Sequence, residues 1–93
     1  MRRIERTTQF KRDYKREAKG RYQAAISTIL VEAVEFLVID EALPARYFDH
    51  ALTGQWSDFR DCHIKPDLIL IYQKPNLDLL RLVRLGSHSQ LGL

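Results

Sequence analysis

Apolar residues recur at helical spacing in the amino-terminal part of the chain. Phe10, Tyr14 and Ala18 follow one another at intervals of four, and basic residues occupy most positions between them. This spacing places the three apolar side chains on one face of a helix. Thr7 or Thr8 can accept a hydrogen bond from a free backbone N–H at the helix start. The pattern therefore predicts a basic amphipathic helix.

A second, longer helix is predicted to follow the first. It carries a wide apolar stripe, and Glu32 and Glu35 lie on its other side. We expect the two helices to form an antiparallel hairpin that shares one core face. The apolar positions of the stripe are Ala25, Ile26, Ile29, Leu30, Ala33, Val34 and Leu37.

The second half of the chain has the pattern of β-strands. Residues 40–57 show no clear period, so we interpret them as a connecting loop with at most one short helical turn. Residues 68–72 are apolar on both faces, which indicates a central strand covered by the helices. Residues 3–7 alternate loosely, which indicates a short edge strand. The main predicted strands are 59–64, 68–73 and 77–85, separated by turns at 65–67 and 74–76.

This order of elements predicts the fold class. A strand, two helices, a loop and three strands joined by short turns give an α+β fold, in which two N-terminal helices pack on a twisted antiparallel sheet. The chain has 93 residues, which is the size of one small domain, and it shows no internal repeat or linker. We therefore expect a single domain over residues 1–93.

Charge and cysteine content narrow the possible partners and compartment. Residues 1–22 carry nine Lys or Arg and three acidic residues, although the whole chain has a net charge of only +3. Such a surface suits an anionic partner, either nucleic acid or an acidic protein, or is simply a solvated helix face. A single cysteine and the lack of a long apolar segment predict a cytoplasmic protein that does not enter a membrane.

The three histidines are the main candidates for chemistry. Asp61 and His63 are two positions apart on one predicted strand, so they project from the same face. Asp67 follows the next turn, and Arg84 and His88 share a side of the last strand. The long loop can bring a further histidine over this end of the sheet. The expected cluster comprises His50, His63, Asp67, Arg84 and His88, with Asp61 beside it.

Two histidines, a carboxylate and a cation are the groups that cleave RNA without a metal. One imidazole removes the proton of the ribose 2′-hydroxyl, another protonates the leaving 5′-oxygen, and a cation stabilises the charge on phosphorus. Imidazole suits both steps because its ordinary pKa of about 6.5 is close to neutral pH. A carboxylate such as Asp67 or Asp61 can orient the ring. The alternative for each histidine is a side chain that is solvated or satisfied in the core.

Other chemistries fit the sequence less well. The spacings of 13 and 25 positions between histidines match no compact zinc-ligand pair, and Cys62 points to the opposite strand face from His63. There is no nucleophile elbow and no glycine-rich phosphate loop. We therefore expect neither a metal nor a cofactor. Trp56 and Tyr47 either stack on bases or anchor the loop on the core.

Several motifs occur together in this chain. Residues 47–72 combine His-x-Leu-x-Gly-x-Trp, starting at His50, with Arg-Asp-x-His and Pro-Asp. With residues 10–15 and 81–88, they closely resemble the YafQ family of bacterial toxins, which belongs to the RelE/ParE superfamily. The resemblance covers nearly the whole chain. It implies a RelE/ParE-like, microbial-RNase-like fold, which agrees with the elements predicted above.

The resemblance implies a toxin of a type II toxin–antitoxin pair. Such a toxin is a ribosome-dependent endoribonuclease, or mRNA interferase, which cuts translated mRNA in the ribosomal A site and so inhibits translation. We expect His88 to be the general acid and His50 or His63 the base. By position, the expected catalytic residues are His50, His63, Asp67 and His88 with Asp61 in support, and Arg84, Arg60 and Lys65 are expected to bind substrate.

The resemblance also implies partners, and two alternative functions stand beside it. The partners are a cognate antitoxin with an acidic, partly disordered segment that wraps the toxin, the ribosomal A site with its mRNA, and operator DNA reached only through the antitoxin complex. The basic first helix suits ribosomal RNA or the antitoxin. The alternative is a ParE-like toxin that inhibits DNA gyrase without nuclease chemistry, or a module that only binds an antitoxin. One departure is Gly92, which stands where the family usually has an aromatic residue and puts its stacking contact with mRNA in question.

Overall fold

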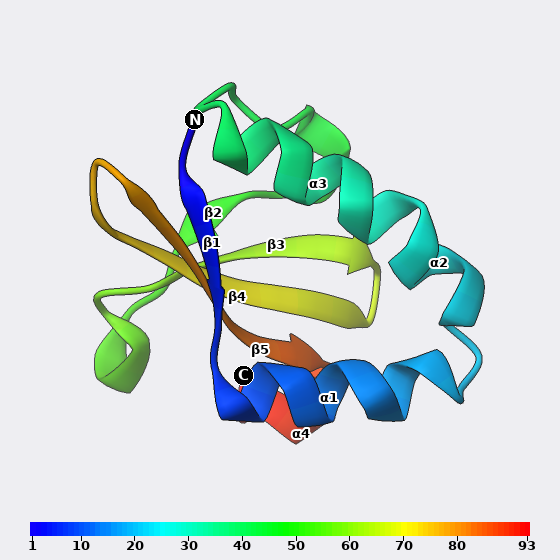
Figure 1. Ribbon diagram of the computed structural model, residues 1–93. Helices are drawn as coiled ribbons and strands as arrows, with labels where there is room; N and C mark the ends of the chain where they lie inside the picture. The colour runs from blue at the N-terminus through cyan, green and yellow to red at the C-terminus, as the bar shows by residue number, and fades with distance from the viewer.

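In the computed structural model, which describes residues 1–93, three helices, α1 to α3, pack against one face of a five-stranded sheet (Figure 1). The strand order is β1-β5-β4-β3-β2, and β3, β4 and β5 form the predicted antiparallel meander. The elements are β1 (Arg3–Arg6), α1 (Thr8–Ala18), α2 (Gln23–Ser27), α3 (Ile29–Val38), η1 (Ala45–Tyr47), β2 (His50–Ala51), η2 (Gly54–Trp56), β3 (Arg60–Lys65), β4 (Leu68–Asn76), β5 (Leu79–Gly86) and α4 (His88–Leu91).

The predicted α+β class is confirmed, with one correction to the sheet. The edge strand β1 pairs parallel with β5, so that Ile4 lies opposite Leu80, and the sheet is mixed rather than antiparallel. Parallel neighbours require a long crossover, and here the helices and the meander separate the two strands in sequence. The alternation of residues within β1 carries no information about the direction of its partner, so the pattern could not reveal this.

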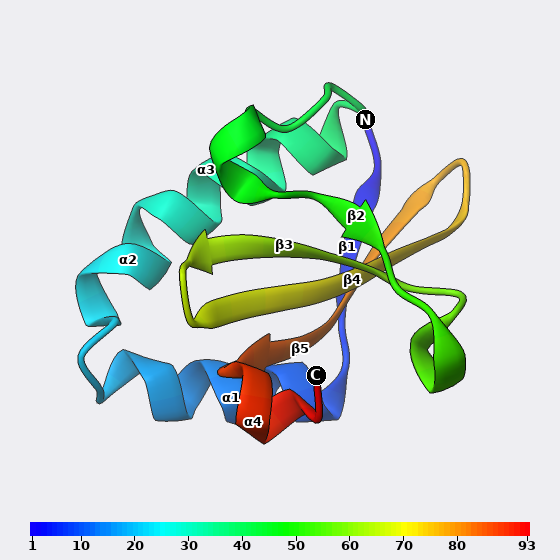
Figure 2. The ribbon, with the colours of Figure 1, turned by 180° about the vertical axis from the view of Figure 1, so that it is seen from behind.

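The second predicted helix is broken into two. The hydroxyls of Ser27 and Thr28 donate hydrogen bonds to the carbonyl oxygen of Ala24 at 3.0 and 2.8 Å, and Thr28 leaves helical geometry with φ −126° and ψ −72°. Such hydroxyl bonds to the preceding turn compete with the helical ladder. α1 lies against β5 and α3 lies over β3, and the two helices diverge, so the predicted antiparallel hairpin is not formed (Figures 1 and 2).

The segment 40–57 is more ordered than the loop that was predicted. It contains two turns of 3-10 helix, η1 and η2, and between them the strand β2, in which His50 lies opposite Asp61. A two-residue strand is too short to show a period. The turn predicted at 74–76 was also wrong, because these residues continue β4 and the chain reverses just after them.

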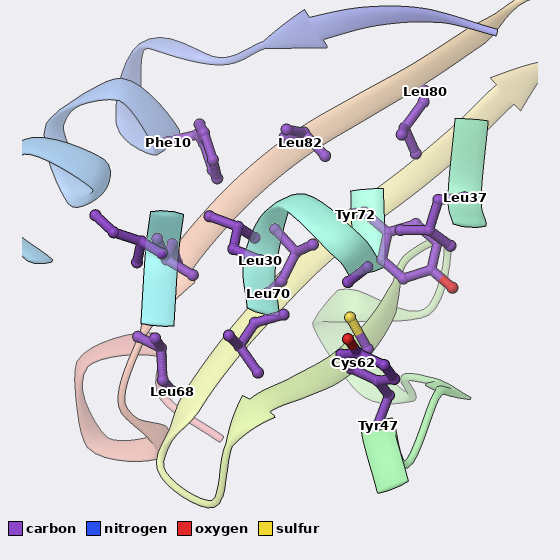
Figure 3. Packing of buried hydrophobic residues seen from close by; sticks show 14 of the residues in the cluster. Phe10, Leu30, Leu37, Tyr47, Cys62, Leu68, Leu70, Tyr72, Leu80 and Leu82 are labelled. Carbon is purple, nitrogen blue, oxygen red and sulfur yellow. The ribbon is translucent and has the colours of Figure 1, made fainter. Parts of the chain in front are cut away.

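The main core lies between the helices and the sheet (Figure 3). Residues 68–72 are entirely buried, which confirms the predicted central strand, and they are covered on both faces. Leu68, Leu70 and Tyr72 face the helices, whereas Ile69 and Ile71 form a second, smaller cluster with Leu91 on the other face. No helix in the molecule is both long and apolar enough to cross a bilayer.

A β-bulge in β5 changes which residues share a face. Leu82 pairs with Tyr72, but Arg84 pairs with Ile71, so one residue of β5 has no partner between them. Leu80 and Leu82 therefore belong to the main core, whereas Arg84 is paired with Ile71, which faces the opposite side of the sheet. Strict alternation along β5 would place all three on one side, but the bulge shifts the alternation by one residue.

Candidate active site

The three histidines meet on the sheet face that α1, α2 and α3 leave open, where β2 and α4 lie in front of the sheet in Figure 2. His50 belongs to β2, His63 to β3, and His88 is the first residue of α4. The ring centroids of His50 and His63 are 6.4 Å apart, and those of His63 and His88 are 5.4 Å apart. The three rings line one cavity of about 390 Å³, together with Asp61 and Trp56.

The His50 ring is oriented by the backbone of its own loop. Its Nδ1 lies 2.8 Å from the carbonyl oxygen of Phe48. A carbonyl can only accept, so Nδ1 carries the proton that forms this bond. In a neutral ring the other nitrogen, Nε2, is then unprotonated. His50 is about half exposed, and it therefore offers a lone pair that can accept a proton.

The His88 ring is oriented by a carboxylate. Nδ1 of His88 lies 2.7 Å from Oδ1 of Asp67, and the backbone N–H of His88 donates to the same oxygen at 2.9 Å. These two hydrogen bonds lower the pKa of the Asp67 carboxyl. An ionised carboxylate accepts only, so Nδ1 of His88 is the donor and its Nε2 is the nitrogen that remains free to exchange a proton.

The position of His88 depends on a short, well-capped helix. Ser87 and Gln90 form a capping box in which each side chain bonds to the backbone N–H of the other residue. Gly86 precedes this cap, and a Cβ there would lie 2.8 Å from Gln90 Oε1 and 2.9 Å from Arg16 Nη2. Gly92 ends the helix in the left-handed region, with φ +72°. A cap at each end holds a helix of only four residues.

Asp61 lies beneath the histidines and is 3% exposed. Nδ1 of His50 is 3.1 Å from Asp61 Oδ1, but it donates to Phe48, so Oδ1 is buried without a hydrogen-bond partner. Burial raises the pKa of Asp61, and the neighbouring His50, His63 and His88 oppose this rise. A positive charge on the nearby rings is therefore favourable because it compensates a carboxylate that lacks a partner.

The three residues predicted to bind substrate lie at different distances from the histidines and on different faces of the sheet. Arg84 forms an ion pair with Asp13 of α1, with Nε 2.7 Å from Oδ2. In the sheet, Arg84 is in register with His50 but three strands away from it, which is roughly 14 Å at ordinary strand spacing. Arg60 lies on the opposite face and binds Asp49 at 3.2 Å. Only Lys65 borders a groove that His63 also lines. The histidines and the two aspartates thus come together, whereas the arginines do not join them.

The aromatic residues of this loop also differ from expectation. Tyr47 is 1% exposed and donates to Glu32 Oε1 at 2.7 Å, so it anchors the loop and has no face free for a base. Burial and the hydrogen bond to Glu32 raise the pKa of Tyr47 to about 12. Trp56 is half-buried against Phe59 and lines the histidine cavity. Phe48 was not predicted from the sequence; it is 67% exposed, and its ring centroid lies 5.7 Å from that of His63.

No group of three or more His, Cys, Asp or Glu side chains is arranged to hold a metal ion. The buried Cys62 faces the helices and the main core, as the alternation of β3 predicted. Burial raises the pKa of its thiol well above the ordinary value. The site as described therefore consists of three imidazoles and two carboxylates.

Comparison with known proteins places the chain in a family. A family model described as "Bacterial toxin of type II toxin-antitoxin system, YafQ" matches residues 2–92. "Putative toxin YafQ" of Haemophilus influenzae is 42% identical over 88 residues, which cover 91% of this chain and 86% of that protein. "mRNA interferase toxin YafQ" of Escherichia coli K12 is 51% identical over 49 residues, or 53% of this chain and 52% of that one.

A solved structure shows that the likeness extends to the fold. The toxin in a crystal structure of the E. coli DinJ–YafQ toxin–antitoxin complex is 37% identical to this chain, with a TM-score of 0.82, and the match covers 97% of this chain and 96% of that one. The resemblance seen in the sequence motifs is thus confirmed by sequence and by structure. The chain belongs to the YafQ family of bacterial toxins of type II toxin–antitoxin systems.

Proposed function

We propose that this chain is an endoribonuclease, an mRNA interferase, that cleaves mRNA on the ribosome by histidine acid–base catalysis without a metal. One observation carries this proposal. His50 and His88 each hold Nδ1 on an oxygen acceptor and leave Nε2 free, and they lie on either side of His63 in one cleft. The name of the E. coli relative, an mRNA interferase toxin, agrees with this chemistry.

We divide the two proton transfers between His50 and His88 because each leaves Nε2 free. Nε2 of His50 removes the proton of a ribose 2′-hydroxyl, and the resulting oxygen attacks the adjacent phosphorus. The bond from phosphorus to the 5′-oxygen breaks, and Nε2 of a protonated His88 supplies the proton that this leaving oxygen needs. The products are a 2′,3′-cyclic phosphate and a free 5′-hydroxyl. Each such transfer contributes roughly 10²- to 10⁴-fold in rate.

The carboxylates support these two roles in different ways. Asp67 fixes the His88 tautomer and stabilises the imidazolium that must exist before the proton is given up. Asp61 lies beneath His50 and stabilises the imidazolium that forms when His50 takes its proton. His63 has no hydrogen bond of its own and lies between the other two rings. We assign His63 to the phosphate, where its protonated ring stabilises the charge that develops on phosphorus.

The experiment that tests this function is expression of the chain in cells without an antitoxin. Wild type, His88→Gln and the exposed-site control Ser89→Ala are induced for a short pulse, and translation, DNA synthesis and mRNA ends are followed separately. We expect wild type and Ser89→Ala to arrest translation and to produce new mRNA ends, and His88→Gln to do neither while remaining folded. Arrest of DNA synthesis with intact mRNA would overturn the proposal in favour of a gyrase inhibitor.

We also propose that a cognate antitoxin covers α1 and the groove between α1 and α3. The DinJ–YafQ complex shows such a partner for a relative. The groove has a volume of about 540 Å³ and is mostly apolar, and it includes Tyr14, 39% exposed, and Val31, 46% exposed. Basic residues of α1 lie beside it, which suits an amphipathic acidic segment. Operator DNA would be reached only through that complex.

A pair of charge substitutions tests the antitoxin surface. Val31→Glu places a carboxylate inside the groove, whereas Leu77→Glu makes the same change on a side chain that is 85% exposed in the β4–β5 turn. We expect Val31→Glu to lower the affinity for the co-expressed antitoxin by at least about tenfold, since a buried charge without a partner costs more than ~1.4 kcal/mol. Equal affinities of both variants would place the antitoxin elsewhere.

A further inference from the structure

Phe48 exposes its ring beside the histidines although the residue before it is buried. Tyr47 is 1% exposed and Phe48 is 67% exposed. The Phe48 ring lies edge-on to His63, with an interplanar angle of 61° and 5.7 Å between centroids. A single exposed aromatic side chain needs no explanation by itself. One that is held against a ring of the candidate active site is a different case.

The backbone fixes Phe48 in this outward position. Its φ of 48° and ψ of 42° lie in the left-handed region, which bulky residues rarely adopt. Two hydrogen bonds hold this geometry: the Phe48 N–H donates to Ala45 O at 3.0 Å, and its carbonyl accepts from Nδ1 of His50 at 2.8 Å. Residues held in such conformations cluster at ligand-binding and catalytic sites. The same turn therefore orients His50 and presents Phe48.

Phe48 forms one side of a groove of about 510 Å³ that is separate from the histidine cavity but shares His63 with it. Ile64 and Pro66 give the groove apolar surface, and Lys65 lies at its edge. Lys65 is exposed and has no ion-pair partner, whereas Arg46 in the same groove is paired with Glu32. An open aromatic face next to an unpaired ammonium is the combination that binds single-stranded RNA.

We infer that this groove is a nucleotide subsite, in which a base of the mRNA next to the cleaved bond stacks on Phe48 and its phosphate contacts Lys65. The inference rests on the proposed ribonuclease function, because it concerns the substrate of the same site. Stacking here positions the RNA beside His63, in a groove separate from the cavity that Gly92 lines. Phe48 is thus a positioning residue for substrate and takes no part in proton transfer.

The test measures cleavage on ribosomes programmed with a short mRNA, under single-turnover conditions at varied toxin concentration. The variants are Phe48→Leu, Phe48→Tyr and Phe48→Trp, and Leu77→Ala is the control for loss of an exposed apolar side chain far from the site. Thermal unfolding establishes that each variant is folded. Each variant is also assayed on mRNAs in which one nucleotide at a time around the cleaved bond is abasic.

We expect Phe48→Leu to raise the toxin concentration for half-maximal rate by about 5- to 150-fold, the range found when a base loses an aromatic stacking partner. The maximal rate should change far less, and Phe48→Tyr and Phe48→Trp should behave like wild type. When the abasic nucleotide is at the stacked position, wild type should need the same raised toxin concentration for half-maximal rate as Phe48→Leu. Combining Phe48→Leu with this abasic mRNA should raise that concentration no further.

Several results would overturn the inference. Equal half-maximal concentrations for wild type and Phe48→Leu would leave Phe48 without a role in binding. If the effects of Phe48→Leu and of the abasic nucleotide add fully at every position tested, Phe48 acts only through the backbone that orients His50. Weaker antitoxin binding by Phe48→Leu with unchanged cleavage would assign the groove to a protein. If wild type cleaves no mRNA at all, the proposed function fails first, and that result is distinct from the other three.

Discussion

Asp13 is the buried charge on which the packing of α1 against β5 depends. It is 2% exposed and accepts hydrogen bonds from Arg84 Nε at 2.7 Å, from the Leu85 N–H at 3.0 Å and from Arg16 Nη1 at 3.0 Å. Burial alone would raise its pKa, but the bonds from Arg84, Leu85 and Arg16 outweigh burial and hold the pKa of this carboxyl below its ordinary value. We predict that Asp13→Ala and Asp13→Asn both lower stability, the alanine variant more.

The magnitude follows from the three donors. In Asp13→Ala the buried Leu85 N–H loses its acceptor, which costs ~1–3 kcal/mol, and the loss of the charged contact with Arg84 costs ~1.5–3 kcal/mol. Arg16 is 40% exposed, so its contact adds less than ~1 kcal/mol. We expect the free energy of unfolding to fall by about 4 kcal/mol in Asp13→Ala and by about 2 kcal/mol in Asp13→Asn, because asparagine keeps one acceptor oxygen. The total free energy of unfolding of a domain of this length is ~5–14 kcal/mol.

Urea unfolding of wild type, Asp13→Asn and Asp78→Asn tests this estimate, because Asp78 is an exposed carboxylate at the other end of β5. The pKa of Asp13 is lower in the folded than in the unfolded chain, where it is about 3.9. Its stabilisation is therefore complete above the unfolded pKa and is lost as the pH falls through the folded pKa. The difference in free energy of unfolding between wild type and Asp13→Asn should be constant from about pH 5 to 8 and should shrink below about pH 4. A gap under ~1 kcal/mol at pH 7, or one that persists in acid, would refute the reasoning.

Three further predictions concern the site. Asp67→Asn should lower the single-turnover cleavage rate by about 10- to 100-fold with little change in half-maximal concentration, because it removes the charge that stabilises protonated His88; an unchanged rate would contradict the assigned role. A chelator of transition metals, at fixed Mg²⁺ so that ribosomes stay intact, should leave cleavage unchanged, and loss of activity restored by one added metal would argue for a metal enzyme. Gly92→Ala should lower the melting temperature by about 4–8 °C, since φ +72° costs a residue with a Cβ about 1 kcal/mol, whereas no neighbour lies within 4 Å to clash. Gly92→Asn should lower the melting temperature less than Gly92→Ala, and an equal decrease in both variants would mean that backbone strain is not the cause.

The sequence predicted those parts of the fold that its periodicity encodes. The alternation along β3 and the doubly apolar 68–72 segment identified the meander and its central strand, and the apolar spacing of α1 identified the first helix. The errors fall where the period is interrupted or too short to read. Ser27 and Thr28 break a helix through hydrogen bonds that an apolar stripe does not reveal, and the bulge before Arg84 shifts alternation by one residue.

The candidate site was predictable to a similar extent. Two-residue spacing placed Asp61 and His63 on one face, and the turn brought Asp67 near, but the partner of Arg84 was hidden. That partner is Asp13, which is 71 positions away in sequence and lies among the basic residues of α1. Phe48 was overlooked for another reason: whether Tyr47 or Phe48 is buried depends on a left-handed backbone angle, and neither residue type indicates it.

The arrangement of core and site has a consequence for every experiment on the histidines. The main core lies on the helix side of the sheet, whereas His50 and His88 are carried by β2 and α4, two short elements on the other side. Their rings are about half exposed and bond to a loop carbonyl and to a turn carboxylate. Substitution there removes little buried surface, so it should cost less than about 1 kcal/mol of stability, as surface changes generally do. Loss of toxicity in such variants with an unchanged unfolding curve therefore reports on chemistry, and a large drop in stability would show that these rings also hold the loop and α4 in place.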